Sequence, residues 1–125
     1  MALFLQLPFY AQETALTLDA LSKTGVGAVL PDQCGALGLY AIFAATGVPP
    51  FGAYQMVLET RVSGASEWTD TGEIFPLVTA AGVYKFAFSS PVLDEVRIRV
   101  EGTNTTGAVV QFTWLADVDG LTLST

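Results

Sequence analysis

The stretch of residues 54–100 constrains the fold most strongly, because apolar and polar residues alternate there in short runs that turn sequences separate. In residues 54–62 the alternation has a period of two, which places Leu58 and Glu59 on opposite faces of a β-strand. Four short strands joined by tight turns predict an antiparallel β-sheet, against which the rest of the chain must pack. The other three runs of this kind are residues 73–78, 83–88 and 96–100.

The remaining sequence adds strand patterns and no convincing helix. Short or alternating apolar runs occur at residues 13–21, 26–30 and 108–116. Residues 36–45 are continuously apolar, as in a strand that is covered on both faces. A helix is the competing interpretation of this run, but its glycines and aromatic residues favour a strand. The chain is therefore predicted to be all-β, with about eight strands in a two-sheet antiparallel β-sandwich that is jelly-roll-like.

The length of 125 residues predicts one domain. Residues 1–12 precede the first regular pattern and are assigned to an apolar N-terminal arm, and residues 13–125 to the β-sandwich domain. Two interpretations of the arm stay open: an edge strand folded onto its own sandwich, or a segment that docks on a neighbouring subunit. Docking would use apolar side chains that are too many to leave in water, namely Leu3, Phe4, Leu5, Phe9 and Tyr10.

The composition indicates a protein whose surface is partly covered by partner chains. Charged residues make up 14% of the chain and hydrophobic residues 51%, whereas about 25% charged residues is typical of globular domains. We therefore expect assembly with other proteins and with copies of this chain; a neutral surface rich in Ser, Thr and Gly is the alternative. A net charge of −7 with five Lys and Arg argues against a nucleic-acid partner. The apolar N-terminal segment is too short to span a bilayer, so no membrane association is expected.

The central stretch also carries a run of short motifs, W-T-D-x-G, then T-A-A-G-x-Y, then R-x-R-V. Their order resembles a recurrent β-sandwich domain of tailed-bacteriophage virion proteins, and the resemblance covers residues 13–120. One departure is that the Asp-Gly common ahead of the tryptophan is replaced by residues 64–67. The matching residues are Ser66, Trp68, Thr69, Asp70, Gly72, Phe75, Thr79, Ala80, Ala81, Gly82, Tyr84, Arg97, Ile98, Arg99 and Val100.

The resemblance implies a structural role in a phage particle, made in the cytoplasm of a bacterial host. The implied partners are the major capsid protein or other virion proteins, and a homotrimer is the expected form. Such domains occur on capsid surfaces and in neck or tail assemblies, so the resemblance alone does not fix the position on the particle.

The residues for catalysis are missing from the sequence. The chain has no histidine, one cysteine, Cys34, no glycine-rich phosphate loop and no G-x-S-x-G motif. Glu67, Asp70 and Glu73 are interpreted as solvated turn carboxylates rather than as a pair for glycoside hydrolysis. Residues 117–120 are interpreted as an Asp-Gly turn rather than as part of a calcium loop. We therefore expect no enzyme activity, no catalytic residue, no cofactor and no metal.

Two features allow both a structural and a functional interpretation. Trp68 is expected to plug one end of the sandwich with its indole N–H paired to a carbonyl, or alternatively to stack on a sugar. Arg97 and Arg99 are expected on one face of a strand, where they would form solvated cross-strand pairs or meet acidic groups of another subunit. The predicted interface residues are therefore Leu3, Phe4, Leu5, Phe9, Tyr10, Arg97 and Arg99.

The first hypothesis for function is a capsid decoration or cement protein that stabilises the head of a tailed phage by bridging capsomers. A neck or tail accessory protein is one alternative. A carbohydrate-binding β-sandwich is the other, and it predicts that Trp68, Trp114 or tyrosines are exposed together on one face.

Overall fold

The computed structural model describes residues 2–31, 34–47, 51–88, 92–102 and 107–124, and only the backbone of residues 2–8, 34–35 and 117–124. The described residues contain ten β-strands and no helix. The strands are β1 (Ala2–Gln12), β2 (Leu16–Thr17), β3 (Ser22–Thr24), β4 (Ala28–Val29), β5 (Cys34–Ala45), β6 (Tyr54–Arg61), β7 (Thr69–Asp70), β8 (Gly82–Ala87), β9 (Glu95–Gly102) and β10 (Ala108–Ser124).

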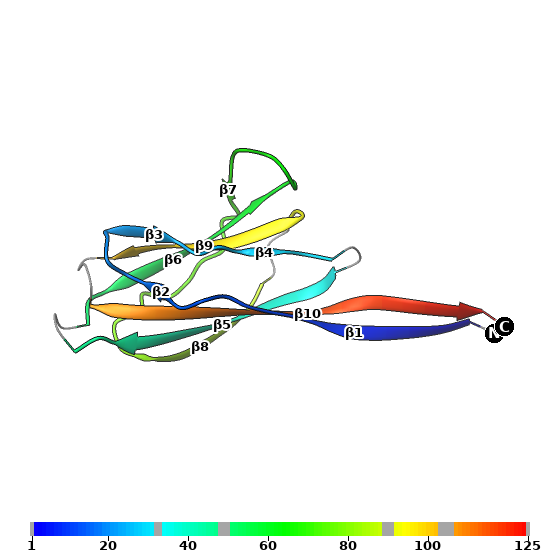
Figure 1. Cartoon of the computed structure of the whole chain (residues 1–125), viewed down its shortest axis with the longest axis horizontal. Helices are drawn as coiled ribbons and strands as arrows, with labels where there is room; N and C mark the ends of the chain where they lie inside the picture. Colours follow the sequence, from blue (N-terminus) through cyan, green and yellow to red (C-terminus); the bar gives the residue numbers. More distant parts are fainter. Residues whose placement is uncertain (1, 32–33, 48–50, 89–91, 103–106, 125) are drawn as a thin grey trace.

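The strands form two antiparallel sheets that pack face to face (Figure 1). Sheet A has the order β1-β10-β5-β8, with β2 also paired to β10, and sheet B has the order β3-β9-β6-β7, with β4 also paired to β9. Because β5 occupies the other edge of β10, β2 continues the line of β1; likewise, β4 continues the line of β3 beside β9. The ten strands therefore make eight lines when they are counted in chain order, with β1 and β2 as line 1, β3 and β4 as line 2, and the other strands as lines 3 to 8. In these numbers sheet A is ordered 1-8-3-6 and sheet B 2-7-4-5, which is the order of a jelly roll.

The predicted two-sheet, jelly-roll-like sandwich is confirmed. The single four-stranded sheet expected over residues 54–100 is wrong, because β6 and β9 lie in sheet B, β8 lies in sheet A, and residues 73–78 form only an isolated bridge at Val78.

The core lies between the sheets and is built from alternate residues of the long strands. In sheet A, Leu39 lies opposite Trp114 in the β5–β10 ladder, and in sheet B, Leu58 lies opposite Ile98 in the β6–β9 ladder; all four are buried. This is the period of two that the sequence shows, because successive side chains of a strand point to opposite faces. The largest fully buried side chains include Trp114, Tyr54, Phe112, Leu18 and Met56.

The expectation that residues 36–45 are covered on both faces is wrong, although their strand conformation in β5 is as predicted. Leu39 and Phe43 are buried against the core, whereas Ile42 is 39% exposed and Ala44 is also exposed. The apolar residues on the second face of β5 belong to the outer face of sheet A, which no described part of this chain covers.

The expected turn at residues 117–120 and the tail after it are also corrected. β10 continues without a turn to Ser124, because β1 pairs with it from Gln12↔Thr113 to Ala2↔Ser124. The ladder supplies partners for the backbone N–H and C=O groups, and this outweighs the local turn preference of an Asp-Gly sequence. β1 and β10 run side by side beyond the sandwich and end together (Figure 1). We call residues 2–8 and 117–124 the terminal ribbon; β5 reaches only as far as Val118 of it.

One carboxylate links the two sheets. Glu13, which is 8% exposed, accepts the indole N–H of Trp114 at 2.6 Å through Oε2 and the backbone N–H of Gly27 at 3.0 Å through Oε1. Gly27 lies between β3 and β4 and has a φ of 85°, and a Cβ there would lie 2.3 Å from the carbonyl oxygen of Val96. Only glycine fits this position, so the backbone of sheet B comes close enough to bind the Glu13 carboxylate.

Replacing Glu13 with Gln should lower the free energy of unfolding by about 1–3 kcal/mol. The amide has one acceptor oxygen, so either the indole N–H or the Gly27 N–H loses its partner inside the protein. Urea unfolding of the full chain measures the change. Thr14→Ala at the exposed neighbour is the control and should change stability by less than about 0.5 kcal/mol. Equal stability of Glu13→Gln and the parent would contradict a structural role for this carboxylate.

Candidate functional site

The outer face of sheet B carries a set of charged side chains from β6 and β9. Glu59 lies opposite Arg97 in the ladder, and Arg61 lies opposite Glu95. Arg97 Nε donates to Glu59 Oε1 at 2.9 Å, and Arg61 Nε donates to Glu95 Oε2 at 2.9 Å. The register of the two strands therefore converts alternating charges in the sequence into cross-strand ion pairs.

Arg99 lies next to Arg97 on this face. Its Nε is 3.6 Å from Glu59 Oε2, which is an ion-pair distance but too long for a hydrogen bond, and one terminal nitrogen donates to Glu101 Oε1 at 2.5 Å. Glu59 is only 8% exposed and faces both guanidinium groups. The charges of Arg97 and Arg99 are thus compensated within the chain. Their predicted contact with another subunit stays a prediction.

Trp68 does not plug the sandwich, so that interpretation is wrong. The side chain is half-buried on the outside of sheet B, where the guanidinium carbons of Arg61 and Arg97 lie 4.4 Å and 4.3 Å from the ring centroid. Each such contact is worth about 0.5–1 kcal/mol at an exposed site. The cross-strand pairs hold both arginines in place for this stacking, which explains why a tryptophan is stable outside the core.

The aromatic platform expected of a glycan-binding module is not formed by the two tryptophans. Trp114 is fully buried, and Trp68 lies beneath two guanidinium groups. Trp114 therefore cannot contact a sugar, and Trp68 could do so only after its arginine contacts rearrange.

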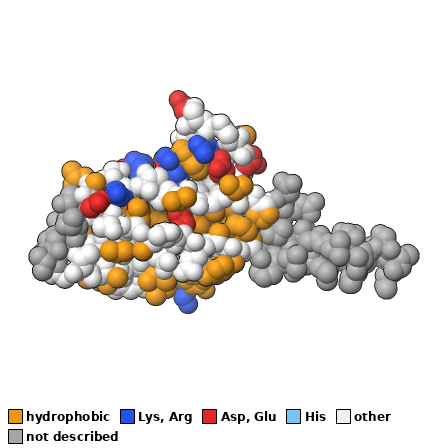
Figure 2. Space-filling view, in the orientation of Figure 1, with side chains coloured by type: hydrophobic (Ala, Val, Ile, Leu, Met, Phe, Trp, Pro, Cys, Tyr) orange, Lys and Arg blue, Asp and Glu red, His pale blue; other side chains and the backbone are white. Residues whose placement is uncertain are grey.

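The outer face of sheet A is different, because it is mostly apolar and nearly uncharged. Tyr10, Leu115, Gly38 and Ala87 lie in one row across β1, β10, β5 and β8. Among the described side chains of this face, Lys85 is the only charged one, and it makes no ion pair with the described residues. Figure 2 shows charged side chains gathered over sheet B and a largely apolar and neutral lower side.

Lys85 lies over the same face as Tyr40, with its Nζ 5.7 Å from the ring centroid. The other lysine, Lys23, pairs with Asp19 at 2.9 Å, and this hydrogen bond lowers the pKa of the Asp19 carboxyl below its ordinary value. The lysine on sheet A is therefore available to an external acidic group, whereas the lysine on sheet B has an acidic partner within the chain.

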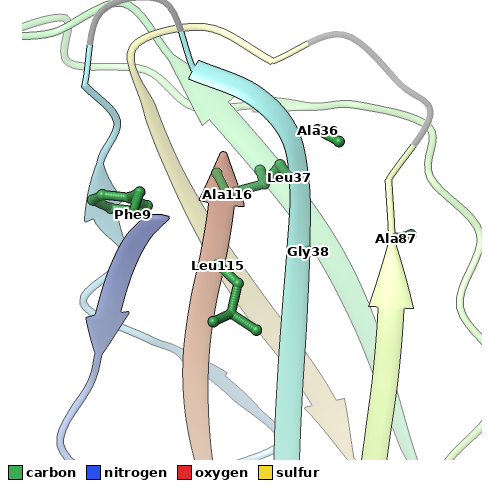
Figure 3. A pocket seen from close by; sticks show the side chains of 7 residues that line it. All are labelled: Phe9, Ala36, Leu37, Gly38, Ala87, Leu115 and Ala116. Atoms are coloured by element: carbon green, nitrogen blue, oxygen red, sulfur yellow. The ribbon is translucent and has the colours of Figure 1, made fainter. Parts of the chain in front are cut away.

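A groove crosses the outer face of sheet A where β5 has no side chain. At Gly38 the strand leaves a gap between Leu115 of β10 and Ala87 of β8, and Figure 3 shows these residues around the opening. The hollow has a volume of about 310 Å³, and its lining also includes Phe9 at the base of the terminal ribbon. An adjoining hollow shares the same three residues and reaches Lys85. We call the two hollows together the Gly38 groove.

The structure separates the predicted interface residues into two groups. Phe9 is partly buried and packs against the core, whereas Tyr10 is 61% exposed beside Leu115. Arg97 and Arg99 lie on the outer face of the other sheet. The backbones of Leu3, Phe4 and Leu5 belong to the terminal ribbon, and their side chains are outside the described residues.

The Gly38 groove is the feature that the sequence interpretation missed. The signal was present, because residues 36–45 are apolar at both alternating sets of positions, and only one set could face the core. Because the second set was also interpreted as covered, the exposed face was not expected.

The carboxylates considered for catalysis do not form a recognisable centre. Asp70 Oδ1 accepts the backbone N–H of Gly72 at 2.8 Å, which is a turn interaction. Within the ranges described above, no group of three or more His, Cys, Asp or Glu side chains could hold a metal ion. No helix in those ranges is long and apolar enough to cross a membrane. The side chain of Cys34 is outside the described residues.

No protein-family model matches the chain, and no curated protein matches it significantly. The resemblance to phage virion domains therefore stays a prediction from the motifs named above.

Replacing Glu59 with Gln should lower the free energy of unfolding by about 1–3 kcal/mol, because two arginines then lose their shared, largely buried carboxylate. Glu101→Gln is the matched control, since it removes an exposed carboxylate that contacts Arg99 alone, and its effect should stay below about 1 kcal/mol. Urea unfolding measures both changes. Equal effects of the two substitutions would show that Glu59 does not organise this face.

Proposed function

We propose that this chain is a non-enzymatic structural protein of a tailed-phage virion, an outer capsid decoration or cement protein that stabilises the head by bridging capsomers. The observation that carries the proposal is the terminal ribbon. It extends from a compact jelly roll, and its base adjoins a nearly uncharged sheet face that is open to a partner.

The ribbon requires a surface to bind. A two-stranded antiparallel ribbon is at best marginally stable in water, because too little apolar surface is buried between two strands. β5 supports β10 only as far as Val118, so most of the ribbon has no third strand. Residues 2–8 are almost entirely apolar and carry no charged side chain. Contact with another protein would supply the missing layer.

The jelly-roll fold fits this role without proving it. Jelly rolls occur in viral capsid proteins and in lectins, and fold alone does not decide between them. The lectin alternative needs accessible aromatic rings; Trp114 is fully buried and Trp68 is stacked against arginines, which leaves tyrosines such as Tyr10. The virion alternative needs an apolar segment for contact and a nearly uncharged face, and the terminal ribbon and the outer face of sheet A have these properties.

The proposed partners are the major capsid protein, other virion proteins and copies of this chain, on a particle assembled in the bacterial cytoplasm. A net charge of −7 suits a protein on the outside of a head, since it disfavours binding to the packaged nucleic acid. The same features would serve at the neck or tail, and imaging of whole particles distinguishes these positions.

Deleting residues 1–7 together with residues 118–125 should weaken binding to particles that lack this protein by about tenfold or more. The shortened chain should stay folded, because it keeps Phe9, Ala11 and the pairing of β10 with β5. Cosedimentation with particles measures binding, and circular dichroism with urea unfolding measures folding.

Ile74→Ser is a control for that experiment, because this side chain is 91% exposed and lies outside the ribbon and the Gly38 groove. It should bind like the parent. A folded, shortened chain that still decorates particles fully would contradict the role given to the ribbon.

A further inference from the structure

We propose that the Gly38 groove is filled by the terminal ribbon of a second copy of this chain, so that copies join head to tail. This inference rests on the proposed structural role and names one partner for the same surface. It follows from three properties of the described residues: the groove, the direction of the ribbon and the placement of charge.

The groove is a contiguous apolar surface rather than a set of scattered side chains. Leu115 and Ala87 form its sides and Gly38 forms its floor, and Lys85 is the residue next to Ala87 on this face of β8. Contiguous apolar patches of this kind mark interaction sites. The floor is at a glycine, and an added Cβ there would lie 3.2 Å from the carbonyl oxygen of Phe86, so a side chain at this position would crowd β8.

A copy cannot fill its own groove. Leu115 in the groove and the residues of the ribbon belong to one continuous strand, β10, which runs away from the sandwich (Figure 1). Reaching back would require breaking the β1–β10 ladder, which is paired from Gln12↔Thr113 to Ala2↔Ser124. The ribbon therefore cannot reach the groove of its own chain, but it can reach the groove of a neighbouring copy.

Charge favours contact of a ribbon with a groove over contact between two ribbons or between two grooves. Lys85 is the only charged side chain among those described on the outer face of sheet A. By sequence, the charged residues of the ribbon are Asp117 and Asp119. Two grooves or two ribbons in contact would bring like charges together, whereas a ribbon on a groove pairs opposite charges. This matters for copies that each carry a net charge of −7.

A head-to-tail contact uses different surfaces on the two copies, so its repetition gives a closed ring where the rotation between copies allows closure. Such a ring would carry several sandwiches with their groove faces covered. It would also give the ribbon a second layer to pack against, which an isolated two-stranded structure lacks.

A charge exchange tests the contact in the full-length chain. Lys85→Glu should raise the self-association Kd by about tenfold or more, because it places a carboxylate against the acidic ribbon. The double substitution Asp117→Lys with Asp119→Lys should weaken association similarly. Combining all three substitutions should return the Kd to within about threefold of the parent. Sedimentation equilibrium at low salt measures each value.

Ala65→Glu with Ser66→Glu is the matched control for Lys85→Glu, since it makes the same change in net charge on the exposed β6–β7 loop and should leave the Kd unchanged. A parent chain that is monomeric throughout the micromolar range would overturn the proposal. So would association that ignores Lys85→Glu, which is the result expected of ribbon-to-ribbon contact, or a triple variant that is not restored.

The same variants separate this inference from the proposed virion role. A monomeric parent that decorates particles would refute the head-to-tail contact and leave the virion role standing. An oligomer that responds to the charge exchange but binds no particle would refute the virion role alone.

Discussion

The structure depends on the pairing of β10 along both of its edges. β5 holds one edge and β1 with β2 hold the other, so β10 is an interior strand of sheet A for most of its length. One face of this strand places Trp114 and Phe112 in the core, and the other presents Leu115 to the outside. Its last residues leave the sandwich as half of the ribbon. Core, groove and ribbon are thus parts of one strand, and their relative positions are fixed by one ladder.

The outer faces of the two sheets differ in polarity, so the two sides of the molecule differ in how they interact with water. Sheet B pairs most charges of its outer face internally, since Glu59 and Glu95 pair with arginines that in turn stack on Trp68, although Arg99 Nε has no hydrogen-bond partner among the described residues. The described side chains on the outer face of sheet A include no comparable set of paired charges. Adhesion is therefore expected on one side of the sandwich and solvation on the other, as suits a protein bound to a larger surface.

The sequence was sufficient for the fold class because the alternation of apolar and polar residues reports directly which side of a strand is buried. It was insufficient where long-range pairing overrides local preference. The Asp-Gly at residues 119–120 favours a turn, yet β10 continues there because residues 2–12 pair with it from the far end of the chain. Trp68 was expected to plug one end of the sandwich, and the two arginines that stack on it outside sheet B come from different strands. The partner of Arg97 likewise depends on the β6–β9 register, which no local pattern encodes.

The order of synthesis adds a consequence of the joined chain ends. β1 pairs with β10, and Ala2 meets Ser124 from far away in the sequence. Sheet A can therefore be completed only after β10 has been synthesised, and contacts so distant in sequence form slowly. Until then the apolar residues of β1 lack their strand partner, and nascent-chain chaperones would have most reason to bind there.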